Sequence, residues 1–291
     1  MTTPTQHTAS HPLTRGDPRL RTAGQLVRLI EAVSPRAATA LADALFCRTT
    51  RRPPRPDEAV FLAEATRQTI PILGQRIVTY RWPGPGPRVL LAHGWASHPG
   101  RFAPMARVLR DAGADLVSFD APGHGASSGW RASMPEFART MQVVADHAGP
   151  LDAVIGHSLG GAAAIFAARH GMPVDRLVTV ATPAAVGGWL DQLRDALGLS
   201  ARVDRLLRER LMRRLKVSEA EIDLPRVAPH LRQTGLVIHD ADDPDVPVAE
   251  AEQLARAWPS ASLIRTHGLG HRAILRDPEV IRAAVRFAVG P

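Results

Sequence analysis

Short apolar segments alternate with amphipathic segments along much of the chain. Buried strands of a parallel sheet appear in a sequence as apolar runs, and helices connect such strands. The pattern therefore predicts an α/β fold with a mostly parallel central sheet flanked by helices. Before the alternation begins, residues 69–82 predict a hairpin that turns at Gly74. The expected strands occupy residues 88–94, 114–120, 152–157 and 176–181, and the expected helices lie near residues 57–67, 101–112, 134–147 and 159–170.

The alternation stops after Pro183. Residues 184–233 contain several helical patterns and no convincing strand. Strands are again predicted at residues 234–240 and 261–268, with one helix between them and another after them. We predict that residues 184–233 form a small helical cap, inserted before the strand at 234–240, over the site that the sheet edge builds.

The N-terminal part of the chain has a different character. Residues 1–17 are polar, and we expect them to be disordered. Residues 20–47 carry apolar positions at helical spacing, interrupted at Pro35, which predicts two short amphipathic helices before an arginine-rich linker. We expect this pair to pack against the parent domain in preference to a membrane surface or a partner. The predicted division is an N-terminal tail with helices (1–55), an α/β core (56–183 and 234–291) and a helical cap (184–233).

Composition narrows the class of protein. Hydrophobic residues make up 45% of 291 residues, enough for a substantial core. The chain has neither a run of roughly 18 apolar residues nor a signal-peptide pattern, so a cytoplasmic protein with no stable membrane insertion is expected. The single cysteine, Cys47, excludes an internal disulfide. The net charge of +8 is spread over arginines, with 4% aromatic residues, which disfavours nucleic-acid binding.

Ser158 is the first candidate for chemistry. It occupies the centre of a G-x-S-x-G sequence, Gly156 to Gly160, between a predicted strand and a predicted helix. A sharp turn from strand to helix lifts a serine hydroxyl clear of the sheet, and glycines remove the side chains that would clash with the turn. This context favours a nucleophile over a small polar residue in an ordinary turn.

A serine hydroxyl needs a base to accept its proton, and the base needs a carboxylate to orient it. Ligands of open parallel sheets bind at the carboxyl ends of the strands, so the partners are expected just after strands. The loop after residues 235–239 and the loop after residues 262–266 qualify, and they give the order Ser, Asp, His. The candidates are Asp240, Asp242, Asp243 and Asp245 for the acid, and His267 and His271 for the base.

Taken together, five motifs in order resemble the α/β-hydrolases, specifically serine hydrolases with a small helical cap. The resemblance extends over roughly residues 69–288 and is specific to fold and triad, but not to substrate. The motifs are LLAHGW (90–95), SFDAPGHGASSG (118–129), GHSLGG (156–161), IHDADDPDVP (238–247) and GLGHRAIL (268–275).

The resemblance implies specific roles for the candidates. The family's H-G-x-x-D-x-x-V-P pattern places the acid at Asp243, and its G-x-G-H pattern places the base at His271. The sequence departs from the first pattern at Asp240, where glycine is usual, and the neighbouring Asp242 remains an alternative acid. We interpret Asp240 and Asp245 as turn-forming or solvated residues.

An acyl transfer site also needs two donors for the oxyanion. The backbone N–H of Leu159, directly after the nucleophile, is one, and the family's pattern places the second at the backbone N–H of Trp95. His93, His124 and His157 lack metal-ligand spacing, and the family uses them structurally. Neither a metal nor another cofactor is expected.

The sequence thus predicts a serine hydrolase that cleaves a carboxylic ester or thioester of a small-molecule acyl substrate through an acyl-enzyme intermediate. A peptidase, a C–C bond hydrolase and a cofactor-free haloperoxidase on the same fold remain alternatives, as does a non-catalytic binding module. The cap should select the substrate, but its apolar residues and arginines also fit ordinary packing and a solvated face. The substrate and the oligomeric state therefore stay open.

Overall fold

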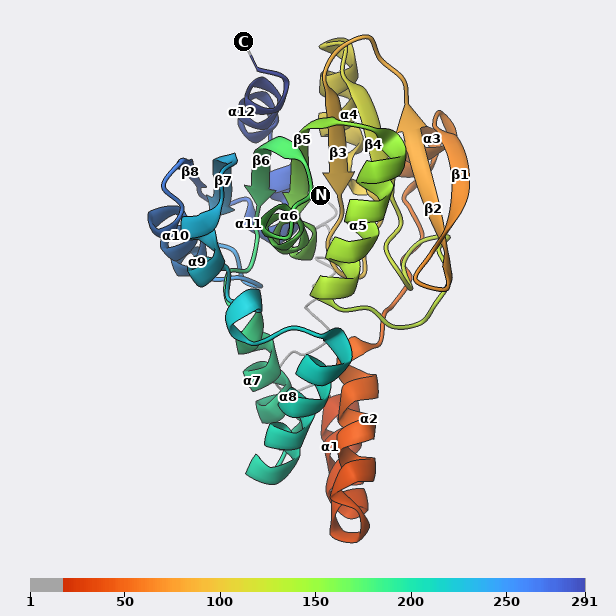
Figure 1. The fold of residues 1–291 in the computed structure, drawn as a ribbon, viewed down its shortest axis with the longest axis vertical. Helices are drawn as coiled ribbons and strands as arrows, with labels where there is room; N and C mark the ends of the chain where they lie inside the picture. The colour runs from red at the N-terminus through yellow and green to blue at the C-terminus, as the bar shows by residue number, and fades with distance from the viewer. Residues whose placement is uncertain (1–17, 291) are drawn as a thin grey trace, which may run out of the picture. The chain divides into compact units, whose positions relative to one another are not determined.

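The computed structural model describes residues 18–290, which form two compact units (Figure 1). The first, here the helical unit, contains the described residues up to Phe46 together with Gly187–Arg214. The second, here the α/β unit, contains Cys47–Val186 and the described residues from Leu215 onward. The disorder expected for residues 1–17 falls outside the described residues. None of the helices described is both long and apolar enough to cross a membrane.

The α/β unit is built on an eight-stranded sheet with the order β1-β2-β4-β3-β5-β6-β7-β8. β1 and β2 form the predicted antiparallel hairpin, and β2 also pairs antiparallel with β4. The strands from β4 to β8 in the sheet order pair in parallel. The prediction of a mostly parallel sheet flanked by helices is therefore confirmed (Figure 1). The strands are β1 (Thr66–Ile72), β2 (Gln75–Trp82), β3 (Arg88–Ala92), β4 (Asp115–Phe119), β5 (Leu151–His157), β6 (Val174–Val180), β7 (Thr234–Asp240) and β8 (Ala261–Thr266).

Helices connect these strands and bury their apolar faces. The central strands are almost entirely buried, as their apolar runs predict. α4 packs on α12, α5 packs on α6, and one core cluster joins α3, α4 and α12 to the strands. The principal helices of the unit are α3 (Pro56–Ala63), α4 (Ala103–Asp111), α5 (Met134–Ala148), α6 (Leu159–Arg169), α10 (Val248–Ala257) and α12 (Pro278–Val289), with shorter turns at α9 (Leu224–Val227) and α11 (Gly270–Ala273).

The helical unit combines two parts of the chain that lie far apart in the sequence. Its helices are α1 (Pro18–Val33), α2 (Pro35–Cys47), α7 (Val186–Leu197) and α8 (Ala201–Leu215). The buried carboxylate of Asp43 on α2 pairs with Arg210 and Arg214 on α8. On α1, the Arg28 guanidinium donates to the carbonyl of Leu197 at 3.2 Å. Some arginines of the expected cap therefore pair inside this unit.

This grouping differs from the predicted division of the chain. The two N-terminal helices share a unit with α7 and α8, whereas residues 215–233 of the expected cap belong to the α/β unit. Short amphipathic helices bury their apolar stripes against one another, and that pairing is independent of their order along the chain. The arginine-rich linker contacts the rest of the α/β unit. Its Arg51 donates to the carbonyls of Gly125, Ser127 and Gly129.

Candidate active site

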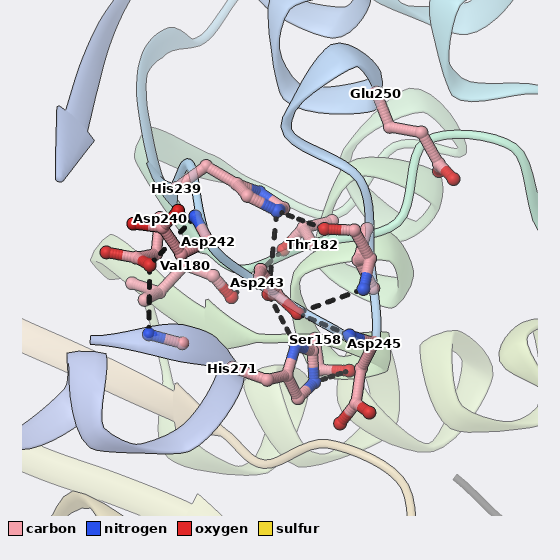
Figure 2. Close-up of polar contacts among 12 residues, drawn as sticks. Ser158, Val180, Thr182, His239, Asp240, Asp242, Asp243, Asp245, Glu250 and His271 are labelled. Atoms are coloured by element: carbon pink, nitrogen blue, oxygen red, sulfur yellow. Dashed lines mark hydrogen bonds and ion pairs between the residues drawn. The ribbon is translucent and has the colours of Figure 1, made fainter. Parts of the chain in front are cut away.

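Three loops at the carboxyl edge of the sheet bring the predicted triad together. Ser158 follows β5, Asp243 follows β7 and His271 follows β8, and all three lie in the α/β unit. The distance from His271 Nε2 to the Ser158 hydroxyl oxygen is 3.0 Å. On the other side of the ring, His271 Nδ1 lies 2.8 Å from Asp243 Oδ2 (Figure 2). The spacing suits proton transfer from the serine to an oriented imidazole.

The turn that presents Ser158 is strained and tightly packed. Ser158 has φ 53° and ψ −125°, a left-handed conformation that is uncommon for a residue with a side chain. Its N–H donates to the carbonyl of Val180 on the neighbouring strand at 2.8 Å. A Cβ at Gly160 would lie 2.1 Å from the carbonyl oxygen of Ala92, so only glycine fits there. Steric contact with the sheet thus fixes the position of the hydroxyl.

Asp243 is the carboxylate that contacts His271. Its Oδ1 accepts the N–H groups of Asp245 at 2.8 Å and Val246 at 2.9 Å, while Oδ2 faces the imidazole. Burial raises the pKa of Asp243, but the hydrogen bond and charge of His271 and the two backbone donors outweigh it, so the net pKa is lowered. The carboxylate is therefore ionised at neutral pH and can stabilise an imidazolium.

The alternative candidates lie apart from this contact. The Asp242 side chain is 64% exposed, and its carboxylate accepts the N–H of Gly268. The His267 side chain is 78% exposed, and its Nδ1 lies 3.9 Å from Asp242 Oδ2. Neither side chain contacts Ser158 or His271 among the interactions of the described residues.

His157, the residue before Ser158, connects the serine loop to the histidine loop through a hydrogen bond. Its Nε2–H donates to the backbone carbonyl of His271 at 2.7 Å. Burial, followed by the nearby charge of His271, lowers the pKa of His157 to about 3. The ring is therefore neutral at pH 7 and serves as a hydrogen-bond donor that fixes the histidine loop.

His93 and His124 also have structural roles, because their hydrogen bonds join the loop after β3 to the loop after β4. His124 Nε2 accepts the N–H of Ala96 at 3.0 Å, and His93 Nε2 accepts the N–H of Ala121 at 3.1 Å. Burial lowers the pKa of His124 to about 4 and holds the pKa of His93 well below its usual range. Within residues 18–290, no group of three His, Cys, Asp or Glu side chains is arranged to hold a metal ion.

The two expected oxyanion donors belong to segments that border Ser158. Leu159 is the first residue of α6, directly after Ser158, and Trp95 follows Gly94. A Cβ on Gly94 would lie 2.9 Å from Ser158 Cβ, so the Trp95 loop passes close to Ser158. In the described part of the chain, neither the Trp95 N–H nor the Leu159 N–H donates to a protein acceptor.

Two carboxylates near the site make contacts that the sequence did not indicate. Asp240 forms a turn, as one of its two interpretations expected, by accepting the N–H of Asp242, and it is completely buried instead of solvated. Figure 2 shows it beside Asp242. Glu250, in the first turn of α10, accepts the N–H groups of Ala184 and Ala185 and so anchors the segment that leaves β6. For Asp240, the departure from the family's pattern was the one feature of the sequence that could have indicated a special role. No feature of the sequence singled out Glu250.

Comparisons of the sequence with known proteins agree on one protein family. A family model described as the alpha/beta hydrolase fold matches residues 87–211. Over 244 residues the chain is 30% identical to the pimeloyl-[acyl-carrier protein] methyl ester esterase of Xanthomonas oryzae, covering 70% of this chain and 95% of that one. It is 38% identical over 99 residues to the monoacylglycerol lipase of Mycolicibacterium smegmatis, a match that spans 30% of this chain and 35% of the lipase.

Solved structures agree on the fold. A hydrolase from Pseudomonas aeruginosa superposes with a TM-score of 0.61 at 17% identity, over 78% of this chain and 99% of that one. The thioesterase domain from the curacin biosynthetic pathway superposes with a TM-score of 0.58 at 17% identity, over 78% and 99%. At this identity the likeness establishes the architecture alone.

Proposed function

We propose that this chain, which belongs to the α/β-hydrolase family, is a serine hydrolase that cleaves carboxylic esters or thioesters through an acyl-enzyme intermediate. Its esterase and lipase relatives support the coarse class, ester hydrolysis. The observation that carries the finer proposal is the continuous contact from the Ser158 hydroxyl through His271 to Asp243.

In the proposed first step, the Ser158 oxygen attacks the acyl carbonyl while His271 Nε2 accepts the hydroxyl proton. Asp243 keeps the proton on Nδ1 and stabilises the imidazolium that forms. The tetrahedral intermediate then collapses, and the imidazolium donates its proton to the departing alcohol or thiol. The carbonyl double bond is restored, and the acyl group is held on Ser158 as an ester.

In the second step, water replaces the leaving group. His271 Nε2 accepts a proton from the water, whose oxygen attacks the acyl-enzyme, and the proton then returns to the Ser158 oxygen as the acid is released. The N–H groups of Trp95 and Leu159 are proposed to donate to the oxyanion in both steps. One such donor is typically worth about 3 kcal/mol of transition-state stabilisation.

The substrate is proposed only as a class, a small molecule with an ester or thioester carbonyl. The names of the relatives include a methyl ester and a monoacylglycerol as substrates, which differ in both acyl and leaving group. Their common element is the ester carbonyl, and the triad acts on that element alone. A panel that varies acyl length and leaving group separately is therefore the informative assay.

A fluorophosphonate probe and a panel of p-nitrophenyl esters and acyl thioesters test the proposal. Wild-type protein should be labelled and should hydrolyse at least one panel member, whereas Ser158→Ala should lose labelling and at least about 10⁴-fold in kcat. Ser262→Ala, at an exposed serine of β8, is the matched control and should behave as wild type. An unlabelled, inactive wild type, or an active Ser158→Ala protein, would overturn the assignment.

A further inference from the structure

Asp240 is the last residue of β7, and its carboxylate is completely buried. The carboxylate accepts four hydrogen bonds. Oδ1 accepts the N–H groups of Asp242 at 3.1 Å and Gly270 at 2.9 Å. Oδ2 accepts the Thr266 hydroxyl at 2.7 Å and the N–H of Leu269 at 3.2 Å. Asp242 lies in the loop that carries Asp243, Leu269 and Gly270 lie directly before His271, and Thr266 ends the strand β8 that leads to His271.

The loop that carries His271 lies near the surface, and hydrogen bonds fix much of its backbone. Every residue from His267 to Ala273 is at least partly exposed, and β8 is an edge strand. Leu269 packs against the core cluster, and the Asp242 carboxylate accepts the N–H of Gly268. The N–H groups of Leu269 and Gly270, which precede His271 directly, both point to the one carboxylate of Asp240.

The charge of Asp240 strengthens this attachment. Burial raises the pKa of its carboxyl group, but the hydrogen bonds from Gly270, Thr266, Leu269 and Asp242 outweigh burial, and the net pKa is lowered. An ionised acceptor makes stronger hydrogen bonds than a neutral one. A glycine at this position would leave all four donors without this acceptor.

Asp240 also connects to the acid of the proposed triad. Its backbone carbonyl accepts the N–H of Asp243 at 3.2 Å. The backbone is thus held before and after the His271 side chain, with the Gly270 N–H bound to Asp240 and the His271 carbonyl bound to His157. In this arrangement the imidazole contacts both Asp243 and Ser158.

We propose that Asp240 is a positioning residue, whose carboxylate holds the backbone before His271 so that the imidazole stays aligned between Asp243 and Ser158. The inference rests on the proposed function. It adds a fourth side chain to the machinery, one that does not touch the substrate and acts through the histidine loop.

Four variants separate this role from a purely structural one. Asp240→Ala should lower kcat by about 10- to 100-fold with KM within about twofold, because a small misplacement of the base affects the transition state more than binding. Asp240→Asn keeps one acceptor oxygen and should recover most of that loss. Thr266→Val removes one of the four bonds, and Asp242→Asn alters the exposed neighbour; both should stay within about fivefold of wild type.

A spectroscopic readout needs no substrate. The proton between His271 Nδ1 and Asp243 should give a downfield NMR resonance in wild type, assigned by its loss in His271→Ala. It should broaden or disappear in Asp240→Ala at a temperature where circular dichroism shows the protein folded, and it should persist in Asp242→Asn. This measurement remains valid even if the panel of esters and thioesters identifies no substrate.

The inference is overturned if Asp240→Ala, folded, retains the resonance and wild-type kcat, or if kcat falls only in proportion to the unfolded fraction. If Asp240→Ala does not fold, Asp240→Asn and Thr266→Val carry the test. A folded Asp240→Asn protein that loses as much kcat as a Ser158 variant while retaining the resonance would equally contradict a positioning role.

Discussion

The loop that presents Ser158 and the loop that presents His271 are held in place by different physical means. The serine turn is fixed by close contact, because the chain around Gly160 leaves no room even for a methyl group. The histidine loop is open by comparison, and a Cβ on Gly270 would have its nearest neighbour at 3.7 Å. Its backbone donates to Asp240 through the Gly270 N–H and accepts from His157 at the His271 carbonyl.

The difference indicates how stability and activity are coupled at each loop. A steric fit forms part of the core, so a change there destabilises the fold. A hydrogen-bonded loop near the surface can shift while the rest of the unit remains folded. We therefore expect changes at the serine turn to lower stability and activity together, and changes at the histidine loop to lower activity first.

The largest expected effect is that of Asp243→Asn. The amide nitrogen cannot accept the His271 Nδ1–H, and it favours the opposite tautomer, so kcat should fall by about 10⁴-fold with little change in thermal stability. Steady-state kinetics on an ester substrate, together with a thermal melt, provide the measurement. Asp242→Asn is the matched control, within about fivefold of wild type; a greater loss in Asp242→Asn than in Asp243→Asn would identify Asp242 as the acid.

Gly160→Ala should have the next largest effect, on stability. The new Cβ would lie 2.1 Å from the carbonyl of Ala92 and 2.5 Å from that of His93, both backbone atoms, so the strand must move. We expect the free energy of unfolding to fall by about 3 kcal/mol in urea titrations. Gly188→Ala on α7, with no atom within 4 Å of the added Cβ, should be neutral or up to about 1 kcal/mol stabilising. Equal stabilities for the two variants would contradict the steric account.

Acid should lower the stability of the fold through two buried histidines that form hydrogen bonds between loops. The pKa values of His124 and His157 in the folded state, about 4 and about 3, lie below the value of 6.5 expected when unfolded. Because the unfolded chain then binds more protons, the free energy of unfolding should fall as pH decreases from about 6.5 toward 4, by up to about 1.4 kcal/mol per pH unit for each histidine.

Urea titrations at pH 7 and pH 5 measure that slope. His124→Gln retains an acceptor for the Ala96 N–H without a titrating ring, so its stability should depend less on pH than that of wild type. A slope unchanged by this substitution would show that His124 does not contribute to the acid sensitivity.

Gly270→Ala should have the smallest effect on stability, and it tests how the histidine loop is held. Gly270 has φ +65°, which costs a residue with a Cβ about 1 kcal/mol, and no close atom adds to that cost. Stability should therefore fall by about 1 kcal/mol, while kcat falls more than this loss of folded protein explains. A destabilisation as large as that of Gly160→Ala would mean that the histidine loop is also fixed by packing.

Much of this molecule is determined by the local sequence pattern. Apolar runs at strand length and apolar stripes at helical spacing reflect burial on two faces or on one, so the order of strands and helices in the α/β unit follows from them. The glycines around Ser158 similarly indicate a turn too tight for side chains. These features depend on near neighbours in the chain, which is why a single sequence contains them.

Only the tertiary structure decided which side chains meet. Asp242 and Asp243 are adjacent in one turn, yet one carboxylate is mostly exposed and the other contacts an imidazole 28 residues away. Asp240 pairs with Thr266 because the register of β7 and β8 places these two residues side by side. The union of the N-terminal helices with α7 and α8 likewise depends on contacts between distant segments. Such contacts are set by the packing of the whole chain, and local periodicity carries no record of them.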